Sequence, residues 1–496
     1  MELAIIPQIS NAPAELPEAE WSWNNMQEAD VLKTKEVVVG RPHFKNDVGY
    51  ADAFANRYRG RIKFIAEEEV WLLFDNERGW HRDKSGEALA LCTEYSRELY
   101  EQALTEARNA EDQQAGANRV REAAKLGDSK RIKPALEFAK VSKEIRISVH
   151  DIDQDPHLLG VTNGVVDLRD GSFNPHSPDV FVTRSCNCKF IPNATCPTFM
   201  KFLEDVHPDA LMQSFLQRLF GFTLTGGVEE HILAFHYGTG ANGKGTTLEQ
   251  VFLRLMGSYG AKLTDNFVYL NNRGASPDLE IAGLFGIRLA LGDENESGGA
   301  LNERLLKAAT GGDKQKGRRH FQDYLEYFPT AKIHLVGNHR PKITGVDEGF
   351  WRRFRLINWG VSIPENKRDS RLAEKLAKEF PGILNWAIQG AIEWYSSGTQ
   401  APDSVIMATD EFREESDAFG DFLREKTVEE ENGSVSVGHL FFCYKHYCDD
   451  QDTKPSYRLN KRSFGLKIAS RGYTQGKINR NERAWKGIRV REQGDQ

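Results

Sequence analysis

Residues 231–247 read HILAFHYGTGANGKGTT, which joins an apolar strand to a glycine-rich turn and a lysine. The next residues, 248–256, have the apolar spacing of a helix. Strand, Gly-x-x-x-x-Gly-Lys and helix in this order form a phosphate-binding loop, whose backbone N–H groups surround phosphate oxygens. The helix N-terminus adds partial positive charge, and Lys244 reaches the β- and γ-phosphates. The sequence therefore predicts an ATP site formed by Gly238, Gly240, Ala241, Asn242, Gly243, Lys244, Gly245, Thr246 and Thr247.

The position after the lysine departs from the usual pattern. It is ordinarily Ser or Thr, whose hydroxyl binds magnesium, whereas here it is Gly245. Thr246 follows directly and is the candidate for that hydroxyl. The sequence leaves the first magnesium ligand open.

A second apolar strand follows the loop and ends in acids. Residues 287–292 lead into Asp293 and Glu294, and Asp293 lies 49 residues after Lys244. A strand-end Asp holds Mg²⁺ in such ATPases, and the next Glu orients and polarises the attacking water. Glu296 is a lesser candidate for the same role. The spacing and order predict Asp293 and Thr246 as metal ligands.

A third apolar strand, residues 331–337, ends at Asn338. In ATPases with an additional central strand, such an amide hydrogen-bonds the γ-phosphate or the attacking water. Arg352 and Arg353 follow 14 and 15 residues later. A guanidinium that enters a neighbour's nucleotide site stabilises charge on the transferred phosphoryl group, and a surface salt bridge is the alternative for this pair.

Residues 314–320 read KQKGRRH, and an aromatic stretch follows at 324–328. Basic side chains beside aromatic ones suit single-stranded nucleic acid, because they combine phosphate contact with base stacking. A solvated charged loop is the alternative. The predicted contacts are Lys314, Lys316, Arg318, Arg319 and His320.

An acidic chain, of net charge −7, ends in a basic segment. From Lys454 to Arg491 there are 12 Lys and Arg against one acid, Glu482. Residues 440–447 and 458–470 have helical spacing, and two strands flank the polar turn after them. Helix, helix and basic hairpin form a winged-helix pattern that suits duplex DNA, with a merely solvated tail as the alternative. The predicted contacts are Lys461, Arg462, Lys467, Arg471, Lys477 and Arg480.

Length and composition bound the class of protein. At 496 residues, 40% hydrophobic and 28% charged, the chain is an ordinary globular protein with about three domains. The sequence shows neither a signal peptide nor an apolar run of the ~20 residues that a membrane span needs. We therefore expect a cytoplasmic location in the host cell and no membrane partner.

Two metal-site alternatives were weighed from the sequence. Cys186, Cys188 and Cys196 precede His207, but they lack the paired Cys-x-x-Cys spacing of structural zinc sites, so reduced, partly buried thiols are favoured. Asp151 and Asp153, placed on a strand, suit the metal ions of a polymerase, whereas a solvated turn is the plainer interpretation.

The order of these motifs along the chain resembles that of the superfamily 3 helicases. The motifs are the phosphate loop, Asp293-Glu294, the basic run after Gly311-Gly312-Asp313, Asn338 and Arg352-Arg353. It is most similar to the type in poxvirus nucleoside triphosphatase-primases and in phage and plasmid primase-helicases. Residues 163–179 and 195–199 are similar to that family's N-terminal accessory domain. Residues 381–386 lie on the helical segment that follows its core.

The resemblance implies an α/β fold with a P-loop, AAA+-like ATPase core, an N-terminal α+β accessory domain and a C-terminal winged-helix domain. The expected division is a poorly ordered leader at 1–35, the accessory domain at 36–200, the core with its following helices at 201–400, a helical linker at 401–430 and the winged helix at 431–496. It also implies Glu294 as catalytic base, Asn338 as sensor and one of Arg352 and Arg353 as a finger acting in trans. The basic run would lie on a hairpin that points into a ring's central channel.

The resulting hypothesis is an ATP- and Mg²⁺-dependent, hexameric DNA helicase that moves 3′ to 5′ in replication of a phage, plasmid or related mobile element. Because no primase domain precedes the accessory region, a separate primase or polymerase is an expected partner. An origin-binding initiator whose ATPase controls assembly and a primase-polymerase are the alternatives. A small-molecule P-loop kinase would leave the arginine pair and the basic tail unexplained.

Overall fold

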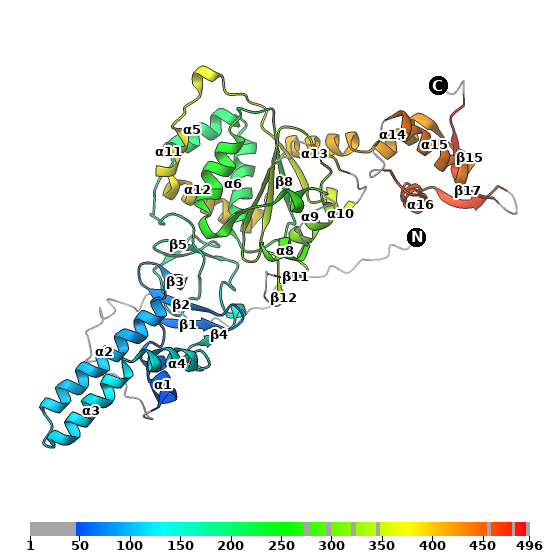
Figure 1. The fold of residues 1–496 in the computed structure, drawn as a ribbon. Coiled ribbons are helices and arrows are strands. Elements are labelled where there is room, and N and C mark those ends of the chain that lie inside the picture. The colour runs from blue at the N-terminus through cyan, green and yellow to red at the C-terminus, as the bar shows by residue number, and fades with distance from the viewer. Residues whose placement is uncertain are drawn as a thin grey trace, which may run out of the picture.

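The computed structural model describes residues 46–270, 277–293, 299–318, 324–343, 348–451, 453, 458–478 and 482–492. Figure 1 shows a central parallel sheet between helices, with N-terminal elements on one side and C-terminal ones on the other. The mixed α/β fold with a parallel sheet is confirmed. The predicted leader and the site candidates Glu294, Glu296, Arg319, His320 and Arg480 lie outside the described residues.

The N-terminal elements form a four-stranded sheet, β3-β2-β1-β4, beside four helices. In chain order they are α1 (Asp47–Arg57), β1 (Ile62–Ile65), β2 (Val70–Asp75), β3 (Gly79–Arg82), α2 (Glu87–Arg108), α3 (Gln113–Leu126), α4 (Ser129–Ala139) and β4 (Arg146–Ile147). Helices α2 and α3 lie side by side and project from the rest (Figure 1).

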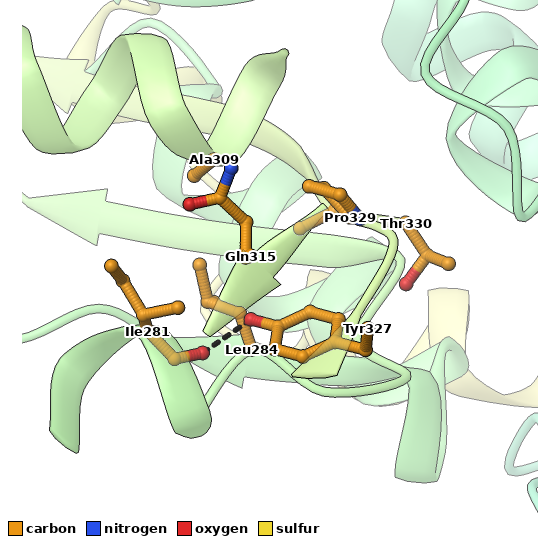
Figure 2. Close-up of a pocket in the computed structure, with 8 residues that line it drawn as sticks. Ile281, Leu284, Ala309, Gln315, Tyr327, Pro329 and Thr330 are labelled. Atoms are coloured by element: carbon orange, nitrogen blue, oxygen red, sulfur yellow. Dashed lines mark hydrogen bonds between the residues drawn. The ribbon is translucent and has the colours of Figure 1, made fainter. Parts of the chain in front are cut away.

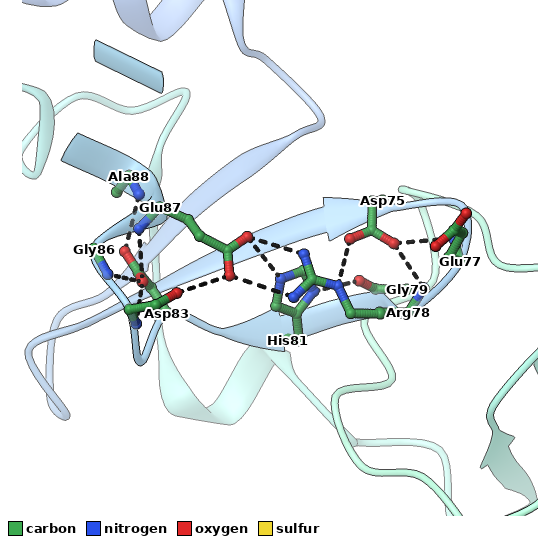
Figure 3. A network of polar contacts seen from close by, with 10 residues as sticks. Asp75, Glu77, Arg78, Gly79, His81, Asp83, Gly86, Glu87 and Ala88 are labelled. Carbon is green, nitrogen blue, oxygen red and sulfur yellow. Dashed lines mark hydrogen bonds and ion pairs between the residues drawn. The ribbon is translucent and has the colours of Figure 1, made fainter. Parts of the chain in front are cut away.

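A polar network closes the β2–β3 turn onto the start of α2 (Figure 3). Asp83 accepts hydrogen bonds from four backbone N–H groups, those of residues 85–88, at 2.7–3.1 Å. Arg78 joins Asp75 and Glu87 through ion pairs of 2.7 and 2.9 Å. The Asp83 carboxylate therefore satisfies the free N–H groups at the start of α2.

The next segment contains η2 (Val149–Asp151) and the antiparallel strands β5 (Leu158–Val161), β6 (Gly164–Asp167) and β7 (Phe173–Asn174). Strands β5 and β6 pair as an antiparallel hairpin. Asp151 and Asp153 lie in a turn, as the plainer interpretation of the sequence has it, and not on the strand that a polymerase site would need. Asp151 caps a 3-10 turn by accepting from Ser148 N at 2.8 Å, and Asp153 has a φ of 53° and accepts from Thr183. Local side-chain hydrogen bonding competes with strand formation at such residues.

The central sheet has the order β14-β8-β13-β10-β9, and every neighbouring pair is parallel. Its strands are β8 (Leu233–Tyr237), β9 (Gly260–Lys262), β10 (Leu289–Asp293), β13 (Lys332–Gly337) and β14 (Phe354–Asn358). The helices and turns around it are α5 (Pro197–Val206), α6 (Ala210–Leu224), η3 (Thr246–Leu253), η4 (Gly257–Tyr259), α7 (Asp265–Val268), α8 (Pro277–Ala282), α9 (Glu303–Thr310), α10 (Glu348–Trp351), η5 (Glu365–Lys367), α11 (Leu372–Lys378) and α12 (Phe380–Ser397). A small antiparallel hairpin, β11 (Gln315–Arg318) and β12 (Tyr324–Tyr327), is inserted before β13.

Both faces of the central sheet are buried. Leu289 and Leu291 of β10 join one hydrophobic cluster with α5, α6 and α12, whereas Ala290 between them joins a second cluster with α7 and α9. This alternation, with helices on each face, explains why the strands read as nearly continuous apolar runs. Val161 and Val166 of the β5–β6 hairpin pack into the first cluster, so this hairpin belongs to the core by packing.

The C-terminal part comprises α13 (Asp403–Glu415), α14 (Ala418–Lys426), β15 (Thr427–Ser436), α15 (Val437–Asp450), α16 (Lys461–Ser470), β16 (Thr474–Lys477) and β17 (Arg483–Val490). The strands form an antiparallel sheet, β15-β17-β16. The two helices and two strands predicted between residues 440 and 490 are confirmed. The structure adds β15 and shows that α14 packs Phe419 and Phe422 into the same cluster as Trp485.

A chain of hydrogen bonds crosses the buried centre of the sheet. Trp359 Nε1–H donates to His236 Nδ1 at 3.1 Å, so the His236 proton is on Nε2 and is donated to His334 Nδ1 at 3.0 Å. His334 Nε2–H donates in turn to Thr223 Oγ1 at 3.0 Å, and Thr223 donates to Leu219 O. The chain is satisfied only when both rings are neutral. Burial lowers the pKa of His334 to about 3 and holds the pKa of His236 well below its usual value, with neighbouring His334 adding to the effect.

We expect the free energy of opening of β8 and β13 to fall as the pH drops from 7 to 5. Unfolded histidine takes up a proton near pH 6.5, whereas buried His334 resists protonation until about pH 3. Protonation of the unfolded chain therefore leaves the free energy of unfolding unchanged above pH 6.5 and lowers it on acidification. For His334 alone the loss at pH 5 is about 2 kcal/mol. Hydrogen exchange of peptides covering both strands in increasing urea, corrected for intrinsic exchange rates, measures this.

The control for that measurement is the exposed histidine His439. His334→Gln should reduce the acid dependence, and His439→Gln should leave it unchanged. Equal opening free energies at pH 7 and pH 5 in the natural chain would contradict the prediction.

Candidate nucleotide site and nucleic-acid surfaces

The carboxyl ends of β8, β13 and β10 lie next to one another at one edge of the sheet. Gly238 follows β8, Asn338 follows β13, and Asp293 is the last residue of β10. Because β13 is hydrogen-bonded between the other two strands, Asn338 lies between the glycine loop and the acid. The structure thus brings together three candidate residues that are far apart in the sequence.

The glycine loop has the backbone that a phosphate cradle requires. Gly240, Ala241 and Gly243 have φ values of 102°, 50° and 88°, in the left-handed region. Gly238 meets a different constraint, since a Cβ atom there would lie 2.3 Å from Asn242 Nδ2 and 2.6 Å from Trp359 O. Successive N–H groups in such alternating conformations form concave anion sites.

Lys244 is the first residue of the helix after the loop and is only 4% exposed. Its Nζ atom donates to Gly238 O and lies 3.2 Å from both Asn242 Oδ1 and Asn338 Oδ1. Asn242 is itself held by its Nδ2–H bond to Trp359 O at 3.1 Å. The ammonium therefore lies within the loop and contacts the candidate sensor, and a phosphate anion would be a stronger acceptor than these neutral oxygens.

The predicted helix is present, and after its first two residues it continues as a π-helix, η3, a geometry that is frequent at functional sites. Gly245 has a helical φ of −61°, and a Cβ atom built there would meet no described atom within 4 Å other than its chain neighbours and the backbone of its own helix. Thr246 is half-buried. Thr247 is fully buried, and its hydroxyl has no hydrogen-bond partner among the residues that the structure describes.

Asp293 is half-exposed and paired with a lysine that the sequence did not single out. Lys262 Nζ lies 2.5 Å from Asp293 Oδ2 and 2.5 Å from Glu249 Oε1. Lys262 ends the short edge strand β9, and Glu249 lies on η3. The position of Glu249 on the helix after the phosphate loop is visible in the sequence, whereas its contact with Lys262 depends on the order of the strands in the sheet.

The arginine pair lies at the amino ends of the strands, at the end of the sheet opposite the loop. Arg352 and Arg353 directly precede β14, whose first and last residues pair with the first and last residues of β8. The length of β14 therefore separates them from the loop of their own chain. Arg353 is half-buried and donates to Gly349 O, whereas Arg352 is exposed and lines an open cleft of about 550 Å³.

The basic hairpin displays its cations around an aromatic ring. Lys316 and Arg318 lie 4.5 and 5.5 Å from the ring centre of Tyr324, which is 50% exposed. Lys314 forms an ion pair with Glu326 at 2.8 Å. The structure therefore places three of the five predicted contacts on β11 and just before it.

The base of the hairpin is fixed to the core (Figure 2). The Tyr327 hydroxyl donates to Ile281 O, and a Cβ atom at Gly317 would lie 2.6 Å from Ala282 N. The space that Tyr327 and Gln315 help to enclose is about 10 Å³, roughly that of one water. It is too small for a ligand, so this pocket is packing that holds the hairpin on α8.

The basic residues of the C-terminal part separate into two groups. Lys461, Arg462 and Lys477 are exposed. Lys467 is half-buried over the Phe419 ring at 5.1 Å, where burial lowers its pKa to about 8, and Arg471 pairs with Asp417. The last two cations therefore contact α14 and its N-cap.

The cysteines near residue 190 are packed in the protein. Cys186 and Cys196 are buried, and burial raises the pKa of Cys196 to about 11 and that of half-buried Cys188 to about 12. His207 packs its ring on Trp359 at 4.3 Å. Among the described residues, no three His, Cys, Asp or Glu side chains form a group that could hold a metal. No helix in the described ranges has the length and apolar character to span a membrane.

Gly238→Ala should weaken binding of a fluorescent ATP analogue by about tenfold or more, the equivalent of an overpacking cost of roughly 1–3 kcal/mol. The added methyl group would overlap Trp359 O and the Asn242 amide. Gly245→Ala is the matched control, since its added methyl group meets open space and binding should stay within about twofold. Equal affinities for the two variants would contradict this account of the loop.

Two family models match the chain. Residues 51–208 match the model described as D5 N terminal like, and residues 414–489 match the model described as Poxvirus D5 protein-like. Among solved structures, an A form apo structure of the NrS-1 C terminal region covers 90% of this chain at 10% identity and a TM-score of 0.47.

The curated relatives are viral proteins. "Putative helicase L207/L206" of Acanthamoeba polyphaga mimivirus is 27% identical over 318 residues, which cover 59% of this chain and 33% of the relative. "Putative helicase 184R" of Invertebrate iridescent virus 6 is 21% identical over a match that covers 67% of this chain and 38% of the relative. "Putative primase C962R" of African swine fever virus is 25% identical over a match that covers 48% of this chain and 26% of the relative. The chain thus spans 26–38% of the length of these relatives.

Both matched regions are of D5 type, and the relatives carry helicase and primase names, which is consistent with the superfamily 3 primase-helicase type that the motifs of this chain resemble.

Proposed function

We propose that this chain is the ATPase of a ring-shaped, homo-hexameric DNA helicase that moves 3′ to 5′ during replication of a virus, phage or similar element. The observation that carries the proposal is the convergence of Lys244, Asn338 and Asp293 at one edge of a five-stranded parallel sheet. Strand order supports a P-loop, AAA+-like core, because the additional strand β13 lies between the loop strand and the acid strand. The host-cell cytoplasm is the proposed location.

Each residue at this edge has a role in ATP hydrolysis under the proposal. The loop N–H groups and Lys244 bind the β- and γ-phosphates, and Asn338 orients the γ-phosphate or the attacking water. Asp293 and Thr246 offer the carboxylate and hydroxyl oxygens that Mg²⁺ prefers, and half-exposed Asp293 can be reached from solvent. A bound Mg²⁺ would neutralise charge on the phosphates. Glu294 is the proposed general base.

The nucleic-acid surfaces follow from the placement of the cations. Tyr324 with Lys316 and Arg318 suits a single strand, through one stacked base and two phosphate contacts. The C-terminal helices with the β15-β17-β16 sheet support a winged-helix assignment, in which Lys461, Arg462 and Lys477 face solvent and are available to duplex phosphates. Lys467 and Arg471 are assigned to packing. Separate hydrophobic clusters support three units, an N-terminal, a central and a C-terminal one. Because β5 and β6 pack into the central cluster and Phe419 and Phe422 into the C-terminal one, we propose that the boundaries lie before residue 158 and before residue 418 rather than at 200 and 431.

Lys244→Ala should lower ATP turnover by about 100-fold or more, and the stimulation by single-stranded DNA should disappear with it. Displacement of a strand from a duplex with a single-stranded 3′ tail should be lost in parallel. Lys375→Ala, which removes an exposed lysine of α11, is the control that keeps both activities. Retained turnover in Lys244→Ala would remove the phosphate-loop assignment, and turnover without displacement in the natural chain would favour an assembly ATPase.

We infer that Arg352, rather than Arg353, completes the site of a neighbouring subunit. The five residues of β14 span about 15 Å, so neither arginine reaches its own loop, and exposed Arg352 is free of the Gly349 contact that holds Arg353. Arg352→Ala should lower turnover by about 10³-fold. In a head-to-tail ring mixed 1:1 with Glu294→Gln, about one quarter of sites receive both intact residues and activity returns to that fraction.

The same mixture made with Arg353→Ala is the matched comparison. Arg353→Ala alone should retain most of its turnover and give no complementation. Complementation by Arg353→Ala, or none by Arg352→Ala, would reverse the assignment.

A further inference from the structure

A lysine bridges two carboxylates at the edge of the sheet where the loop lies. Lys262 Nζ lies 2.5 Å from Glu249 Oε1 and 2.5 Å from Asp293 Oδ2, so both carboxylates converge on one cation. The three side chains come from η3, β9 and β10, and each is between 37% and 50% exposed.

Glu249 lies on the helix face that Gly245 leaves bare. Because the hydrogen bonds of the π-helix η3 join residues five apart, residue 249 lies close to one turn after residue 245. Position 245 ordinarily carries the magnesium-binding hydroxyl. A Cβ atom at Gly245 would meet open space among the described residues. The carboxylate of Glu249, one turn further along, reaches the same ammonium as Asp293.

Two carboxylates that converge on one point repel each other unless a cation lies between them. Lys262 supplies that cation in the structure. Carboxylate oxygens are also the ligands that Mg²⁺ and Mn²⁺ prefer. The donor set and the central cation therefore fit a divalent metal ion at this place.

We propose that Glu249 is a metal-binding carboxylate that compensates for the hydroxyl missing at Gly245, and that Lys262 holds Glu249 and Asp293 together until the metal displaces it. The inference rests on the proposed nucleotide site and adds to it one ligand and one internal competitor. Thr246 is then not required as the first protein ligand.

Electron paramagnetic resonance of Mn²⁺, titrated into the full chain with ADP, measures metal affinity without turnover. Glu249→Gln should weaken Mn²⁺ binding by about tenfold or more. Lys262→Met should tighten it by about two- to fivefold, since the metal no longer displaces an ion pair of ordinary surface strength. Changes of Mn²⁺ affinity in opposite directions for these two contacting residues distinguish a metal role from a merely structural ion pair. Loss of a structural ion pair would change the affinity of both variants in the same direction.

A rescue sharpens the test. Gly245→Ser, added to Glu249→Gln, should restore Mn²⁺ affinity to within about threefold of the natural chain, because a hydroxyl then occupies the ordinary position. Lys375→Met and Asp369→Asn, which break a second ion pair of 2.5 Å, are the matched controls and should leave Mn²⁺ affinity unchanged. Circular dichroism of each variant verifies folding.

Binding of a fluorescent ADP analogue in EDTA separates this inference from the function on which it rests. If the natural chain binds no nucleotide, the proposed ATPase and the inference both fail. If all variants bind nucleotide equally without metal, yet Glu249→Gln keeps the Mn²⁺ affinity of the natural chain, the inference is wrong and the ATPase proposal stands. Equal losses in Glu249→Gln and Lys262→Met would likewise overturn the metal role.

Discussion

The placement of β13 between β8 and β10 is the constraint on which the site depends. Tyr237 pairs with Gly337, and Val336 pairs with Asp293, so the three strands end level at one edge. The His236–His334 hydrogen bond crosses the first of these strand pairs within the core. A slip of β13 by one residue would turn His334 to the other face of the sheet, away from His236, and would separate Asn338 from Lys244. Register in the core and geometry at the edge are therefore fixed by the same contacts.

The amino edge of the sheet is held by buried cations that meet backbone carbonyls. Lys332 donates to Gly227 O and Thr330 O at 3.0 Å and to Thr225 O, and burial holds its pKa well below the usual value. Arg288 donates to Leu224 O and Leu158 O, which ties β5 to the core. Burying such groups is costly unless they are hydrogen-bonded, and here their donors are used on fixed backbone. The carboxyl edge differs, because Asp293, Lys262 and Glu249 keep part of their surface in solvent. One edge is thus a rigid base, and the other retains charges that a ligand can rearrange.

The predictions that the structure confirms rest on residue patterns within short windows. The contacts that the sequence did not predict depend on packing between residues far apart in the chain. The glycine loop, its flanking elements and the three apolar strands follow from residue type and spacing within short windows. Lys262 lies on a strand of three residues, too short for any periodicity, and its partners come from elements 13 and 31 residues away. The C-terminal basic residues read as one surface group, but Lys467 and Arg471 pack against Phe419 and Asp417. At Asp151 and Asp153 the turn that the sequence favoured is present, because local capping hydrogen bonds outweigh an alternating pattern of acids.

Under the proposed function, the charges at this end of the sheet suit a site that two copies of the chain complete. Lys244 contacts oxygens of its own loop and of Asn338, and Lys262 contacts two carboxylates, so both nearby cations already have acceptors in the same chain. Negative charge that develops on a transferred phosphoryl group needs a further cation with little competing attraction. Arg352 has an exposed side chain, and it lies at the sheet edge opposite the loop. A head-to-tail arrangement places one edge of a subunit against the other edge of its neighbour. Hydrolysis in one site would then depend on the position of the next subunit, which is the coupling that movement along a strand requires.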